Sequence, residues 1–267
     1  VSRELDTGRD AAVAWLAREC GLDEAGATQI ARYIDAEKQA VGFVPTQSDL
    51  LAERFFDEAG GMQLVVHAPL GARVNRAFGL ALRKRFCASF NMELQAAATD
   101  DAIVLSLGNP QTFELELLPR FLNSNTCAEV LEQALLGSPL FTARWRWNST
   151  RSLAVLRSRG KGRVPFPIQR MQADDLLAAS FPEQAACQEN VSYPIEIPDH
   201  PLVAQTMRDC LTEAADVRGL EALLRRLETG EVRMHCLDTV EPSPFSHEIL
   251  NARPYAFLDD APLEERR

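Results

Sequence analysis

The chain has 267 residues, and its 28 basic and 38 acidic side chains give a formal net charge of −10. The apolar content of 46% is ordinary for a protein that buries a core, and the length allows one large domain or two modest ones. No apolar run approaches the roughly 18 residues that cross a bilayer, and the N-terminus lacks the layout of a signal peptide. We therefore expect a soluble, cytoplasmic protein with no membrane partner.

Cysteine usage indicates free thiols rather than a disulfide framework. The six cysteines are widely separated, form no CxxC pair and mostly have apolar neighbours, which is typical of reduced thiols in a core. They are Cys20, Cys87, Cys127, Cys187, Cys210 and Cys236.

The first 120 residues predict two helices followed by a sheet. Apolar residues at helical spacing predict helices over Arg9–Cys20 and Glu24–Val41, with Gly21 and Gly42 as stop signals. The pattern then changes to a hairpin, a helix and a second hairpin, over Leu50–Glu58 with Met62–Ala68, Ala72–Phe90, and Glu93–Ala98 with Ala102–Leu107. We expect an antiparallel sheet with a helix across one face.

From residue 121 the pattern is mainly helical, with one late strand over Glu231–Leu237. The helices are predicted over Thr126–Leu136, Pro139–Leu156, Ile168–Ser180, Pro201–Ala215, Gly219–Glu228 and Ser243–Asn251. Loops rich in glycine or proline, Ser158–Pro167 and Val191–His200, are expected to be the most mobile connections. The predicted fold class is α+β: an antiparallel sheet module with a crossing helix (1–120) and a predominantly helical module (121–267), together forming one compact accessory domain.

The sequence lacks the strong signatures of an enzyme. GxxxxGK[ST], GxGxxG, HExxH and GxSxG are all absent. Among the histidines only His235 adjoins another ligand type, Cys236, and neighbouring residues on a strand point to opposite faces. The pair Asp100–Asp101 lies at an expected turn, where aspartate bonds its own backbone. We predict no catalytic residue, no metal site and no cofactor within this chain.

One segment contradicts the acidic character of the chain. The basic strip, Phe141–Arg170, contains eight basic residues and no acidic one. Without these eight the chain would hold 20 basic against 38 acidic residues, a net charge of −18. Positive charge gathered on one surface attracts polyanions, so a nucleic-acid strand is the expected partner. The eight residues are Arg144, Arg146, Arg151, Arg157, Arg159, Lys161, Arg163 and Arg170.

Helical geometry divides the basic strip into parts. If Pro139–Leu156 is one helix with about 100° per residue, one arc faces the core and carries Phe141, Trp145, Ser152 and Leu156.

A second arc of the same helix carries Arg144, Trp147 and Arg151, together with Leu140. A flat indole between two guanidinium groups suits a stacked base flanked by phosphates. The alternative is that Trp147 packs under a neighbouring helix while the arginines pair with the chain's many acids. The segment after the helix is a basic loop loosened by glycine, with Arg157, Arg159, Lys161 and Arg163.

A second candidate lies at the start of the helix Ala72–Phe90. Pro69-Leu70-Gly71 precedes its first turn, where free backbone N–H groups with Arg73 and Arg76 close by can bind a phosphate. The alternative is that the segment is only a turn between a strand and a helix.

The sequence resembles the C-terminal accessory domain, also called the DEAD/H-associated domain, of the Lhr-type large helicases. The likeness runs through nearly the whole chain, and HAPLGARVN is its most specific part. The matching stretches are Arg54–Phe86, Asp100–Leu107, Phe141–Leu153, Arg208–Cys210, Leu223–Val232 and Glu241–Leu250.

The resemblance implies a longer protein, an ATP-dependent superfamily 2 helicase that moves 3′-to-5′ along single-stranded DNA and is linked to DNA repair. In that family two RecA-like motor domains, which would hold ATP and Mg²⁺, and a winged helix precede this domain. A start without methionine and the charged end LEERR also suggest a piece of a longer protein. The resemblance implies no ATP hydrolysis by this chain, and any role of Trp147 rests on helical geometry because family members vary at the tryptophan positions.

The leading hypothesis is a non-catalytic scaffolding domain that helps hold single-stranded DNA, or a DNA/RNA hybrid, against the motor domains. The predicted contact residues are Arg73, Arg76, Arg144, Trp147, Arg151, Arg157, Arg159, Lys161 and Arg163. One alternative is a structural clamp that docks on the motor and winged-helix domains without touching nucleic acid. Another is a hidden nuclease or glycosylase, which would need converging carboxylates or a metal.

Overall fold

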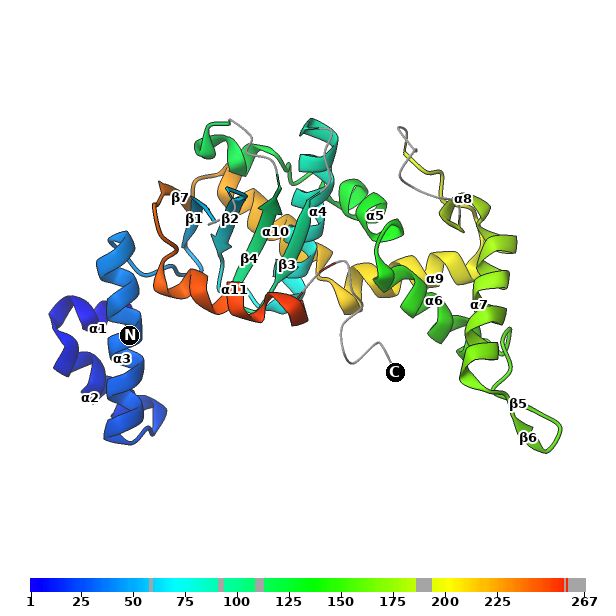
Figure 1. Ribbon diagram of the computed structural model, residues 1–267, viewed down its shortest axis with the longest axis horizontal. Coiled ribbons are helices and arrows are strands. Elements are labelled where there is room, and N and C mark those ends of the chain that lie inside the picture. Colours follow the sequence, from blue (N-terminus) through cyan, green and yellow to red (C-terminus); the bar gives the residue numbers. More distant parts are fainter. Residues whose placement is uncertain (58–59, 91–93, 109–112, 186–193, 257, 259–267) are drawn as a thin grey trace.

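A computed structural model describes residues 1–57, 60–90, 94–108, 113–185, 194–256 and 258. The chain forms a cluster of N-terminal helices, a central five-stranded sheet packed between helices, and a helical part that ends in a small hairpin (Figure 1). The predicted α+β class, with a sheet module and a predominantly helical module, is confirmed.

The N-terminal helices form a small core of their own. They are α1 (Ser2–Thr7), α2 (Arg9–Cys20) and α3 (Glu24–Val41), and the last two have the predicted bounds. The Asp23 side chain accepts a hydrogen bond of 2.7 Å from the Gly26 N–H and caps α3. The buried members of this core are Leu5, Ala12, Leu16, Ala27 and Ala31, so most of them are alanines.

The sheet has the strand order β3-β4-β2-β1-β7. Its strands are β1 (Asp49–Phe56), β2 (Met62–His67), β3 (Gln95–Ala98), β4 (Ala102–Leu107) and β7 (Arg233–Asp238). Both predicted hairpins form, with antiparallel β1–β2 and β3–β4 pairs, while the predicted strand ends Glu58 and Glu93 lie outside the described residues. The late strand β7 pairs in parallel with β1, placing Cys236 beside Ala52.

Helices cover both faces of the sheet, whereas the sequence predicted a helix on one face. α4 (Ala72–Phe90), which has its predicted bounds, and α10 (Val217–Glu228) pack on one face; α11 (Pro244–Ala256) crosses the other (Figure 1). The reason is that β2 and β4 are buried along their whole length, as expected of strands that are apolar on both sides. Leu64 and Val66 face α4, and Val65 shares a cluster with Ile249 of α11.

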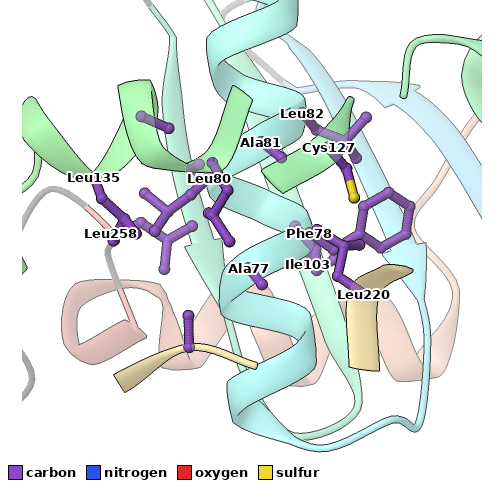
Figure 2. Close-up of a cluster of buried hydrophobic side chains, with 14 of the residues drawn as sticks. Ala77, Phe78, Leu80, Ala81, Leu82, Ile103, Cys127, Leu135, Leu220 and Leu258 are labelled. Atoms are coloured by element: carbon purple, nitrogen blue, oxygen red, sulfur yellow. The ribbon is translucent and has the colours of Figure 1, made fainter. Parts of the chain in front are cut away.

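Figure 2 shows the core on the α4 face. Ala77, Phe78, Leu80, Ala81 and Leu82 of α4 are all buried. They pack among side chains contributed by β4, α5, α10 and the segment after α11, namely Ile103, Cys127, Leu135, Leu220 and Leu258. This helix therefore joins the sheet to the helical part of the chain.

The helical part follows the predicted order, with shifted ends. Its elements are the 3₁₀ helix η1 (Leu115–Arg120), α5 (Cys127–Leu136), α6 (Pro139–Arg151), α7 (Phe166–Ser180), α8 (Pro182–Ala185), α9 (Pro201–Asp209) and the π-helical turn η3 (Cys210–Ala214). The predicted boundary at residue 120 stays a prediction, although β7 and α11 return to the sheet from beyond it. The described residues contain no helix with the length and apolar character needed to span a membrane.

α6 ends earlier than predicted, at Arg151 instead of Leu156. The hydroxyls of Ser149, Thr150 and Ser152 all bond to backbone carbonyls of the last turns, and such bonds compete with helix continuation. Leu153 then takes a left-handed φ of 63°. The predicted core arc is therefore wrong at Ser152 and Leu156, which are exposed.

The predicted loop Ser158–Pro167 contains a two-stranded hairpin, β5 (Ser158–Arg159) and β6 (Gly162–Arg163). Gly160, with φ 60°, supplies the left-handed residue that the tight turn requires. Of the other predicted loop, residues 194–200 have neither helix nor strand, and the rest lies outside the described residues. The five described cysteines are free thiols; Cys127 and Cys210 are buried, Cys20 is exposed, and Cys187 is not described.

Candidate nucleic-acid interface

α6 brings a tryptophan and two arginines onto one face. Ser138 caps the helix by accepting from the Leu140 N–H, and spacings of three and four residues then place Arg144, Trp147 and Arg151 together. The Arg144 Cζ lies 5.0 Å from the centre of the Trp147 ring, and the Arg151 Cζ lies 6.0 Å from it. The predicted grouping of the indole with the two guanidinium groups is present, and its contact with nucleic acid stays a prediction.

The two arginines of this face differ in their accessibility. Arg144 is buried and donates from a guanidinium N–H to the Glu213 carboxylate at 2.6 Å, whereas Arg151 is exposed and Trp147 is half-buried. The alternative in which arginines pair with acids of the chain therefore holds for Arg144. Its guanidinium group lies against the indole, while Trp147 and Arg151 present the accessible part of the face.

The other tryptophan of α6 belongs to the core, as predicted. Trp145 is fully buried, and its Nε1–H donates to the Ala173 carbonyl of α7 at 2.7 Å. On the same helix, burial followed by repulsion from Arg170 lowers the pKa of Arg146.

The β5–β6 hairpin projects from the end of the molecule below α7 (Figure 1). The Val164 N–H donates to the Arg157 carbonyl at 2.9 Å and closes its base. Its basic side chains are exposed, and in the described part of the chain they form no ion pair. They are Arg157, Arg159, Lys161 and Arg163. Cations that have no ion-pair partner among the described residues are available to an anionic ligand.

Exposed apolar side chains accompany this charge, and the sequence reasoning missed them. Phe166 is 63% exposed and lies under Arg163, whose Cζ is 4.9 Å from the ring centre. Leu153, Leu156, Ile168 and Met171 are exposed in the same segment. The apolar residues around Phe166 could be read from the sequence. Leu156 was missed because the predicted helix Pro139–Leu156 placed it in the core.

Arg73 and Arg76 form hydrogen bonds to backbone carbonyls of the same chain. Arg73 donates to the carbonyls of Thr212 and Ala215, and Arg76 donates to the Ala214 carbonyl. These carbonyls end the turn η3, where helical carbonyls lose their internal donors.

The start of α4 already holds a carboxylate. Asp100 accepts from the Ala72 N–H at 2.9 Å, where a phosphate would bind. This arrangement favours the turn interpretation of Pro69-Leu70-Gly71, and phosphate binding by Arg73 and Arg76 stays a prediction.

The turn η3 connects the two groups of predicted arginines. Arg73 and Arg76 bind its carbonyls from α4, and Arg144 binds its Glu213 from α6. A π-helical turn leaves carbonyls without the usual α-helical partners, so arginines from two helices can converge on it. The sequence reasoning found these arginines but not the segment that they share.

A buried serine, histidine and glutamate meet on the other face of the sheet. His67 Nε2 lies 2.9 Å from Glu53 Oε2 and 3.2 Å from Ser246 Oγ, and Ser246 Oγ donates to the same carboxylate at 2.6 Å. A catalytic triad uses separate ring nitrogens for the serine and the acid. Here both contact one nitrogen in a fully buried place, which makes a structural network.

Hydrogen bonds set the charge of this network. Burial raises the pKa of Glu53, but hydrogen bonds from His67, Ser246 and Ser243 outweigh it and lower the pKa to about 2. The anionic Glu53 thereby holds Ser243 and Ser246 at the start of α11. Among the described residues no group of three or more His, Cys, Asp or Glu side chains is arranged to hold a metal ion.

Comparison with known proteins places these features in a family. The fold is an α+β domain with an exposed basic end. The DEAD/H associated family model matches residues 44–246. The chain belongs to this family, as the sequence resemblance predicted.

The relatives of this chain are much longer proteins. It is 29% identical over 255 residues to the Lhr helicase/uracil glycosylase of Escherichia coli (strain K12), covering 95% of this chain and 15% of that protein. It is 24% identical over 244 residues to the ATP-dependent helicase Lhr-Core of Sulfolobus acidocaldarius, covering 91% of this chain and 26% of that protein. The chain therefore spans a minor part of these relatives.

A solved structure has the same fold. The structure of Mycobacterium smegmatis helicase Lhr bound to ssDNA and AMP-PNP matches with a TM-score of 0.74 and 26% identity, covering 91% of this chain and 29% of that one.

Proposed function

We propose that this chain is a non-catalytic domain of an Lhr-type ATP-dependent helicase that helps hold single-stranded DNA. The observation that carries the proposal is the exposed end of the basic strip, where cations without described acidic partners lie beside aromatic rings. The DEAD/H associated family and the likeness to a helicase bound to ssDNA support it. ATP and Mg²⁺ would be held by motor domains elsewhere in the longer protein, with 3′-to-5′ movement and a role in DNA repair.

Within this proposal the predicted contact residues have two tasks. Trp147, Arg151 and the four hairpin cations contact the strand, by stacking and by phosphate pairing. Arg73, Arg76 and Arg144 instead anchor α4 and α6 to η3 and position the indole, because their guanidinium groups already bond within the chain.

Salt-dependent binding of a labelled oligo-dT tests this proposal. Replacing Arg159, Lys161 and Arg163 together by alanine is expected to weaken binding and to lower the slope of log K against log salt by about 2, since each phosphate contact with a single strand contributes about 0.7. The control is the matched triple change of Arg3, Arg18 and Arg32 to alanine on α1–α3, with the same charge change on exposed residues. Binding that is indifferent to salt, or equally weakened by both variants, would overturn the proposal.

A second candidate is a clamp that docks on other domains of the longer protein. The exposed apolar side chains beside the hairpin, including Leu153, Phe166 and Met171, favour it, because protein interfaces bury such groups. The clamp predicts no DNA affinity for this chain. It also predicts that the hairpin triple variant reduces ATPase stimulation in the full protein, which separates it from strand holding.

A further inference from the structure

A pocket of about 250 Å³ lies between α3, the end of β2, the β3–β4 turn and the start of α11. Ile30, Ile34, Tyr33 and Phe245 form much of its wall, and the rings of Tyr33 and Phe245 have centres 4.9 Å apart. Figure 1 shows α3 and α11 far along the molecule from the β5–β6 hairpin. The pocket is therefore separate from the proposed DNA interface.

Two carboxylates, Asp101 and Glu248, line this pocket together with the ring of His67. His67 is 2% exposed. Among the described residues its hydrogen bonds are made by Nε2, to Glu53 and Ser246. The ring therefore lines the pocket while its Nε2 stays bonded within the Glu53 network.

Asp101 and Glu248 give the rim of the pocket negative charge. Asp101 and Glu248 form no ion pair within the described part of the chain, and the Glu248 carboxylate accepts from the Tyr33 hydroxyl at 3.1 Å. Burial, followed by the charge of Glu248, raises the pKa of both Tyr33 and Asp101. Glu37 is fully buried and accepts a hydrogen bond of 2.9 Å from the Phe245 N–H, and burial raises its pKa.

The size and chemistry of the pocket select one kind of occupant. Its volume is below the roughly 300 to 1,000 Å³ of small-molecule sites, so it suits a single side chain. The acidic rim repels phosphates and attracts a cation. Between the two cationic side chains, the planar guanidinium of arginine stacks on aromatic rings and has five donors for several acceptors, whereas lysine is a point charge.

We propose that this pocket binds an arginine side chain presented by a protein partner. The stem lies against Ile30 and Ile34, the guanidinium plane lies against Tyr33 or Phe245, and its N–H groups donate to the carboxylates of Asp101 and Glu248. The proposal goes beyond strand holding and does not depend on it, because neither a DNA contact nor the basic strip takes part.

The test is an NMR titration of the ¹⁵N-labelled chain with the blocked tripeptide Gly-Arg-Gly. We expect saturable shifts at the amides of Tyr33, Thr99, Ala102 and Ile249. The same peptide with citrulline, which keeps the shape and loses the charge, should bind about tenfold or more weakly, since a charge-assisted bond is lost.

Two near-isosteric variants locate the site. Asp101→Asn and Glu248→Gln, both at exposed positions, should each weaken binding of the arginine peptide about tenfold. Asp175→Asn on α7 is the control with the same loss of charge, and it should bind like the unaltered chain.

Several results would overturn the proposal. They are equal binding of the citrulline peptide, equal loss in the Asp175→Asn control, or shifts at these amides with oligo-dT instead of the arginine peptide. Spectra of the two variants that retain the dispersion of the unaltered chain exclude misfolding as the cause of lost binding.

Discussion

Two tryptophans, two positions apart in α6, have opposite environments. Trp145 is fully buried and bonds Ala173, while Trp147 lies half-buried against Arg144 and Arg151. A step of two residues turns a helix through about 200°. Trp145 therefore points into the core, and Trp147 lies toward the surface.

Alanine substitutions should separate these two roles. Trp145→Ala is expected to lower the free energy of unfolding by about 3–5 kcal/mol because it empties a packed site. Trp147→Ala should cost much less stability but weaken oligo-dT binding by about 1–3 kcal/mol, the cost of one lost stack. Urea unfolding and DNA titration measure the two effects, and the same effect from both variants would contradict the assignment.

The buried Glu53 should make stability depend on acid. Its folded-state pKa of about 2 is below the ordinary 4.5, so its stabilisation is complete above about pH 4.5 and is lost as the pH falls toward 2. The shift corresponds to about 3 kcal/mol. Glu53→Gln should therefore be less stable by a similar amount at pH 7, with a difference that shrinks at pH 3.

Urea unfolding of both proteins at pH 7, 4.5 and 3 measures this difference. Asp175→Asn, at an exposed position, is the control and should show none. A difference that is the same at every pH would show that Glu53 acts by packing instead of by charge.

At the scale of elements, the end of α6 decides which part of the basic strip is exposed. The helix ends at Arg151, and the left-handed Leu153 turns the chain toward the β5–β6 hairpin. A left-handed conformation costs an L-residue with a side chain roughly 1–2 kcal/mol. The junction is therefore a strained position on the surface.

Glycine at this junction should relieve the strain. Leu153 is 72% exposed, so Leu153→Gly loses little packing and is expected to raise the free energy of unfolding by about 1 kcal/mol. Leu153→Ala, which keeps a Cβ, should bring no gain. Thermal and urea unfolding measure both, and an equal effect of the two changes would contradict the backbone explanation.

The whole molecule contains cores of unequal strength. The α1–α3 core is small and most of its buried members are alanines, whereas the sheet core joins early and late parts of the chain through the β1–β7 pair. Regions with few buried apolar contacts open at lower free energy. The N-terminal helices should therefore open without unfolding of the sheet.

Hydrogen exchange followed by mass spectrometry tests this order. Amides of β2 and β4 should be the most protected, with β1 and β7 exchanging together and α1–α3 exchanging faster. Leu16→Ala should speed exchange in α1–α3 and leave β2 and β4 unchanged, because it leaves a cavity only in the small core. Equal acceleration throughout would indicate a single cooperative unit.

Local spacing in the sequence determined the bounds of α2, α3 and α4, both hairpins, and the approach of Arg144 and Arg151 to Trp147. These features depend on residues close in the chain, so helical and strand periodicity suffices to predict them. The same reasoning failed at Ser152 and Leu156, where side-chain bonds to the backbone end the helix.

Tertiary structure alone decided which distant segments meet. It paired β7 with β1, laid α11 over the second face of the sheet, and brought Arg73, Arg76 and Arg144 to η3. It also formed the acidic pocket between α3 and α11. Such contacts join residues 69 or more positions apart, and their energy depends on packing and complementary groups that no local period of the sequence records.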